Sequence, residues 1–150
     1  MPNPMNPGDR ETELANEAYL RQLKKTFEQL PNDIPLLLFT EKGRNDVFAQ
    51  ATRQLIRAFR ELSPRITLKE YGLDHELAQK YSVTSAPTLL IAPQTYAIRW
   101  LGAPMGEEAR SFLETLILVG RGQSDLSEQS RKVAGRIDSA RRVKVFVSPT

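Results

Sequence analysis

Residues 85–92 read Ser-Ala-Pro-Thr-Leu-Leu-Ile-Ala, a polar turn with a proline in it followed by a short apolar run. An apolar run of this length predicts a strand that is buried on both faces of a sheet. Pro93-Gln94 predicts a turn, and residues 96–101 predict a second strand that returns beside the first. The two strands therefore form, in the simplest arrangement, a β-hairpin, and Pro87 stands just before its first strand.

Strand and helix patterns alternate on both sides of this hairpin. Residues 34–40 and 66–71 predict two further strands. Apolar residues at helical spacing predict four helices, over residues 14–30, 46–62, 74–81 and 107–119. Asp46 is expected to cap the second of these helices, because its carboxylate can accept the free amide hydrogens of the first turn. The alternation predicts a central mixed sheet with flanking helices, the α/β class.

The composition is that of one folded domain with or without a terminal extension. Of the 150 residues, 40% are hydrophobic and 26% are charged. The longest uninterrupted apolar run, residues 36–39, is far shorter than the ~18 residues of a membrane span. The first seven residues have neither the charged nor the apolar region of a secretory signal. We therefore expect a cytoplasmic protein with no membrane partner.

The residue types present argue against two large classes of chemistry, those that depend on cysteine and those that depend on several histidines. The sequence contains no cysteine, which excludes disulfides, thiol nucleophiles and cysteine-based zinc sites within it. It contains one histidine, His75, for which we see no nucleophile at a useful spacing and which we interpret as a surface residue. We expect no metal site, no cofactor and no catalytic residue.

Positive charge is concentrated near the C-terminus. Residues 121–150 contain seven Lys or Arg against three Asp or Glu. No aromatic residue interleaves these charges before Phe146, which argues against a surface for stacking nucleic-acid bases. We interpret the charges as the solvated face of a connecting helix and expect no nucleic-acid partner.

The element order β-α-β-α-β-β-α over residues 36–119, with Ala-Pro-Thr at 86–88, resembles the thioredoxin fold. Residues 86–88 look like the cis-proline loop of that fold. Residues 83–90 and 99–113 are similar to the first unit of the two-unit protein disulfide oxidoreductases, glutaredoxin-like proteins of archaea and bacteria. The N-terminal domain of the alkyl hydroperoxide reductase F component is built in the same way. The resemblance covers residues 14–150.

The resemblance and the local composition together divide the chain into four parts. We expect a mobile, proline-rich tail at residues 1–10, a thioredoxin-like unit at 11–122, a linker helix at 123–142 and, at 143–150, the opening strand of a second unit. In relatives that strand leads into the Cys-x-x-Cys of the second unit, and this sequence ends at Thr150, just before it. We therefore expect the second unit to be missing or truncated.

The first unit has also lost its thiols. The positions that match the Cys-x-x-Cys are Asp46 and Ala49. The resemblance thus implies a redox-inactive unit, not an enzyme by itself, that belongs to the machinery of redox homeostasis. Thiol–disulfide exchange would be carried by the second unit, while this unit packs against it and docks a substrate or a partner redox protein.

A free-standing module that binds peptides or proteins is the alternative. In thioredoxin-like proteins the backbone before the cis-proline pairs with an extended substrate, and backbone groups need no cysteine. The residues that would contact the peptide are Ser85, Ala86, Pro87 and Thr88. The partners we expect are a second thioredoxin-like unit, a redox protein or an extended peptide. A homodimer through the strand at 143–150 stays open, because an unpaired strand edge invites association.

Overall fold

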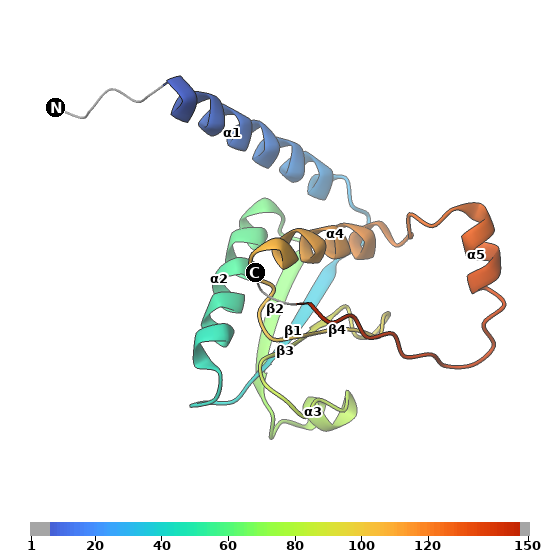
Figure 1. Cartoon of the computed structure of the whole chain (residues 1–150). Coiled ribbons are helices and arrows are strands. Elements are labelled where there is room, and N and C mark those ends of the chain that lie inside the picture. Colours follow the sequence, from blue (N-terminus) through green and yellow to red (C-terminus); the bar gives the residue numbers. More distant parts are fainter. Residues whose placement is uncertain (1–6, 148–150) are drawn as a thin grey trace.

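The computed structural model describes residues 7–147, with side chains described for Glu13 and from Ala15 onward. Nine elements lie in that part of the chain (Figure 1). They are α1 (Pro7–Glu28), β1 (Ile34–Thr40), α2 (Asp46–Leu62), β2 (Ile66–Gly72), α3 (Glu76–Lys80), β3 (Thr88–Ile91), β4 (Ile98–Leu101), α4 (Glu107–Arg121) and α5 (Glu128–Ala134).

The four strands form one mixed sheet in the order β2-β1-β3-β4. β1 and β2 run parallel, because α2 returns the chain to the end of the sheet at which β1 begins. The pairs β1–β3 and β3–β4 are antiparallel. Leu38 pairs with Leu89, and Leu89 pairs with Trp100 in the hairpin. The predicted α/β class, the mixed sheet and the hairpin are confirmed.

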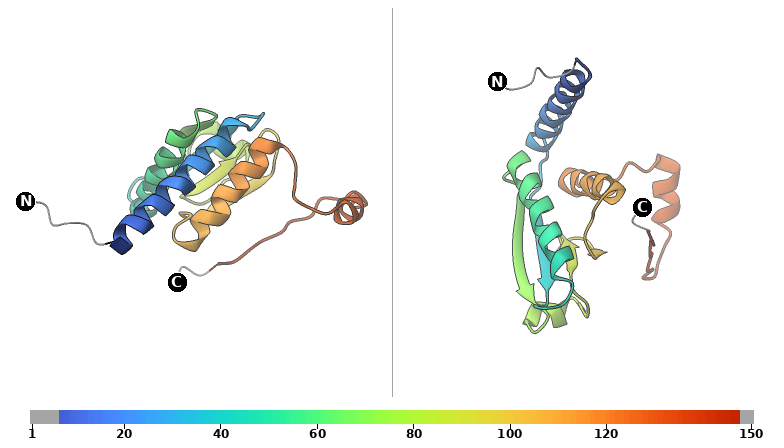
Figure 2. Two further views of the ribbon diagram at one scale, coloured as in Figure 1. Left: turned by 90° about the horizontal axis from the view of Figure 1, so that it is seen from above. Right: turned by 60° about the vertical axis from the view of Figure 1, so that its left-hand side comes forward.

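Helices α2 and α4 lie on one face of the sheet, and the C-terminal end of α1 packs against both of them (Figure 2). Alternate residues of the strands turn their side chains toward these helices and form the main core. Its fully buried strand residues include Ile34, Leu36, Leu38, Leu89 and Ile91. The other face packs against α3, where Phe39, Leu90 and Ala78 belong to a smaller cluster. Both central strands are therefore buried on both faces, which explains their continuous apolar runs.

An aromatic group joins the helices to the edge of the sheet. Phe112 of α4 is fully buried. Its ring stacks on Phe59 of α2 at 5.9 Å and meets Trp100 of β4 edge-on at 5.4 Å. Phe112 therefore holds α2, α4 and β4 in one core.

α1 begins at Pro7, so residues 7–10 of the predicted tail are helical, and residues 1–6 lie outside the described residues. The helix buries Leu23 and Phe27 near its C-terminal end, whereas Leu20 is exposed. The first turns of α1 extend past the sheet (Figure 1). Between residues 7 and 147, no helix has both the length and the apolar character needed to cross a bilayer.

The C-terminal region departs from the prediction. The helix expected over 123–142 is limited to α5, and residues 143–147 do not form the expected strand. A strand is stable only against a partner, and none lies beside this segment within residues 7–147. Val143, Val145 and Phe146 are consequently exposed. Residues 148–150 lie outside the described residues.

We expect Phe112→Ala to lower the free energy of unfolding by about 3–5 kcal/mol, because it empties a fully buried site shared by three elements. Phe146→Ala is the matched control: Phe146 is 89% exposed, so the same truncation should change the free energy of unfolding by less than about 0.5 kcal/mol. Urea unfolding measures both. Equal effects of the two variants would contradict the described core.

Candidate functional site

The loop before β3 is held in place by hydrogen bonds that its backbone carbonyl groups accept. The Ala86–Pro87 peptide bond is cis, as the resemblance implied. The Thr88 hydroxyl donates a hydrogen bond to the Ser85 carbonyl at 2.7 Å, and the amide N–H of Gly102 donates to the Pro87 carbonyl at 3.0 Å. The loop is thus fixed to the start of β3 and to the end of β4.

A third hydrogen bond joins this loop to the start of α2. The side-chain amide of Asn45 donates to the Ala86 carbonyl at 2.9 Å. Asn45 has a left-handed backbone conformation (φ 57°), which asparagine tolerates better than most residues. This conformation places it immediately before the first turn of the helix. The residues predicted for the site from the sequence do not include Asn45, because its partner is 41 residues away.

The structure places Asp46 and Ala49 in the first turn of α2. Ala49 is buried. The prediction that Asp46 caps the helix is wrong: its carboxylate accepts hydrogen bonds from the amide N–H of Gly43, at 3.1 and 3.2 Å, because the left-handed Asn45 occupies the cap position. Asp46 therefore closes the preceding loop, and Asn45 brings this turn next to Ala86.

Among the four predicted substrate-binding residues, Ala86, Pro87 and Thr88 are buried and Ser85 is exposed. The carbonyls of Ser85 and Ala86 already accept internal hydrogen bonds. The amide N–H of Ala86, in contrast, donates no hydrogen bond to any described residue. The backbone at the loop therefore offers an incoming peptide a donor more readily than an acceptor.

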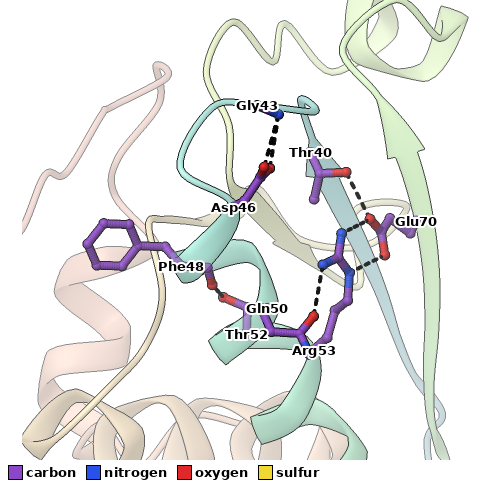
Figure 3. A network of polar contacts seen from close by, with 8 residues as sticks. All are labelled: Thr40, Gly43, Asp46, Phe48, Gln50, Thr52, Arg53 and Glu70. Carbon is purple, nitrogen blue, oxygen red and sulfur yellow. Dashed lines mark hydrogen bonds and ion pairs between the residues drawn. The ribbon is translucent and has the colours of Figure 1, made fainter.

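Exposed apolar side chains flank the loop on two segments that are hydrogen-bonded to it. We call Val47, Phe48, Leu101 and Met105 the apolar rim. Phe48, 49% exposed, points away from the polar network of Figure 3. Leu101 and Met105 lie on either side of Gly102, whose N–H reaches Pro87. Single exposed apolar residues are ordinary, and these four lie within three residues of Asn45 or Gly102, whose hydrogen bonds hold the loop.

A charged network lies behind the first turn of α2 (Figure 3). Arg53 donates two hydrogen bonds to Glu70 of β2, at 2.8 and 2.5 Å, and Thr40 donates a third at 2.8 Å. The bond from Arg53, followed by that from Thr40, holds the pKa of Glu70 below its ordinary value despite partial burial. The network joins α2 to β1 and β2.

His75 is the N-cap of α3. Its Nδ1 accepts a hydrogen bond from the amide N–H of Leu77 at 3.1 Å, and its ring packs on Tyr71 at 4.3 Å. The residue is half-buried, so the interpretation as a plain surface side chain is only partly right. Both observations assign His75 a local structural role.

No family model and no curated protein matches the sequence. Solved structures do match. A protein disulfide oxidoreductase from Aeropyrum pernix k1 superimposes with a TM-score of 0.66 at 22% identity, over 81% of this chain and 54% of that chain. The chain has a thioredoxin-like fold.

Two structures of the alkylhydroperoxide reductase component AhpF from Enterococcus faecalis are also similar to this thioredoxin-like unit. The C503A mutant of AhpF matches with a TM-score of 0.64 at 26% identity, and the NTD_N/C domain with 0.63 at 27%. Each match covers 77% of this chain and 57% of the other. The resemblance found in the sequence is confirmed, and the chain spans just over half the length of these structures.

We expect Glu70→Gln to lower the free energy of unfolding at neutral pH by up to about 1 kcal/mol, since Arg53 and Glu70 are both partly exposed. The folded pKa of Glu70 lies below its unfolded value. The stabilisation is therefore present above the unfolded pKa and is lost as the pH falls through the folded pKa. Urea unfolding at neutral pH and near pH ~3 should show the wild-type advantage shrink in acid.

The control for this experiment is Glu114→Gln, which removes an exposed ion pair with Arg110 within α4. Its effect at neutral pH should stay below about 0.5 kcal/mol. A wild-type advantage over Glu70→Gln that is the same at both pH values would contradict the depressed pKa.

Proposed function

We propose that this chain is the redox-inactive thioredoxin-like unit of a protein disulfide oxidoreductase, in which a second unit carries out thiol–disulfide exchange. Its role is to pack against that unit and to dock a substrate or a partner redox protein. The observation that carries the proposal is the Asn45–Ala86 hydrogen bond, which keeps the start of α2 against the cis-proline loop although Asp46 and Ala49 stand where relatives may have thiols.

Redox inactivity follows from the chemistry of exchange. A thiolate must attack the disulfide sulfur, and a second thiol must resolve the mixed disulfide. The sequence has no cysteine, and the carboxylate of Asp46 does not exchange with disulfides. Any exchange must therefore use thiols from outside this chain.

A docking role is supported by what surrounds the loop. The apolar rim lies on both segments that are hydrogen-bonded to residues 86–87, and the N–H of Ala86 is free of partners among the described residues. These groups can bind an extended polypeptide without any thiol. The match to this chain covers only 54% and 57% of two of the solved relatives, which leaves room in them for a second unit as the structural partner.

Restoring the thiols tests whether the site geometry is intact. We expect the double variant Asp46→Cys/Ala49→Cys to form an intramolecular disulfide and to accelerate insulin reduction by dithiothreitol, because a helix N-terminus lowers the pKa of a thiol. The wild-type chain should not accelerate the reaction.

The matched control is Glu107→Cys/Arg110→Cys, with the same spacing in the first turn of α4 but without the cis-proline loop. We expect the restored pair to be at least about tenfold faster than this control pair. Equal rates for the two pairs, or turnover by the wild-type chain, would contradict the proposal.

The second candidate function, a free-standing peptide-binding module, is favoured by the apolar rim. It predicts that Phe48→Ala weakens the binding of an unfolded, carboxymethylated protein by about fivefold to tenfold, because Phe48 buries its exposed half on contact. Phe146→Ala should leave the Kd unchanged. Calorimetric titration measures both, and an equal Kd for Phe48→Ala and wild type would exclude this function for the rim.

A further inference from the structure

The outer edge of β2 has backbone groups that are free to pair with another chain. β2 is the last strand of the sheet on its side. The amide N–H of Ile34 donates to the Arg65 carbonyl at 2.9 Å, which sets the alternation of the parallel ladder. Residues 65, 67 and 69 therefore turn their backbone groups toward β1, whereas Leu68 and Glu70 turn theirs outward. Within residues 7–147, no strand covers them.

Basic side chains line the same edge. Arg57 and Arg60 of α2 are exposed, and neither forms an ion pair with a described residue. They border an open surface groove between the end of α2 and the start of β2, whose lining includes Ile66 and whose single acidic residue is Glu61. Two arginines against one carboxylate leave this end of the edge positively charged.

We propose that the β2 edge binds an extended acidic segment of another protein. The segment adds to the sheet as a strand through the backbone groups of Leu68 and Glu70, and its carboxylates pair with Arg57 and Arg60. A free strand edge supplies directional hydrogen bonds, and unpaired arginines select for negative charge. The combination specifies both the conformation and the charge of the partner.

The same observations disfavour a nucleic acid as the occupant. A nucleic acid has no backbone N–H groups to pair with a strand, and Tyr71, the aromatic residue of β2, already packs on Phe39 and His75. The edge is also separate from the proposed docking site, because Arg57 and Arg60 lie in the C-terminal half of α2 and Asn45 precedes its first turn.

The test uses the whole chain and a soluble peptide of alternating Glu and Thr, with a Lys/Thr peptide as the charge-reversed probe. We expect the Glu/Thr peptide to bind and to slow hydrogen exchange at the amides of Leu68 and Glu70. Arg57→Gln/Arg60→Gln should weaken its binding by about tenfold or more. Arg131→Gln/Arg136→Gln removes the same charge from exposed positions near α5 and should change the Kd by less than about twofold.

Four outcomes would overturn the proposal. They are equal weakening by both double variants, binding without protection of Leu68 and Glu70, equal binding of the Lys/Thr peptide, and tighter binding of a single-stranded oligonucleotide that depends on Arg57 and Arg60. Each of these would show that the edge responds to net charge or to another class of partner.

Discussion

The hydrogen bond from the Asn45 side chain to the Ala86 carbonyl is the contact on which the site depends. It joins two segments that the sheet alone would not fix to each other, the first turn of α2 and the loop before β3. Left-handed backbone at Asn45 and the Gly43–Asp46 bonds shape the turn, and the Gly102–Pro87 bond anchors the far side of the loop. The first turn of α2 and the cis-proline loop are therefore held together through polar contacts that involve no sulfur.

The central sheet could be predicted from the sequence because its strands are buried on both faces. The runs at 34–40 and 89–92 are continuous for that reason, and the structure has β1 and β3 at those places. The segment at 143–147 is rich in valine, which favours a strand, but it has no partner strand within residues 7–147 and does not form one. A strand-like sequence pattern therefore leads to a strand only where a neighbouring strand is present to pair with it.

The details of the site are harder to predict, because they depend on contacts between residues far apart in the chain. Asp46 has the residue type of a helix cap, yet it bonds to Gly43 because Asn45 takes the cap position. The Asn45–Ala86 hydrogen bond joins residues that are 41 positions apart, and neither residue type indicates it in the sequence. Arg53 has the spacing of the solvated side of its helix, whereas Glu70 of the neighbouring strand engages it through two hydrogen bonds. Local sequence patterns thus predict the helices and strands, whereas the packing of the sheet determines which polar groups form hydrogen bonds.

We propose above that this chain contributes docking and no chemistry to thiol–disulfide exchange. The most direct measurement compares the steady-state kinetics of a thiol-bearing second unit from a structural relative, acting on a protein disulfide, with and without this chain joined to it. We expect a lower KM with an unchanged kcat when the chain is present, because it adds binding to the ground state and the transition state alike. An unchanged KM, or a kcat that rises with this chain, would contradict it.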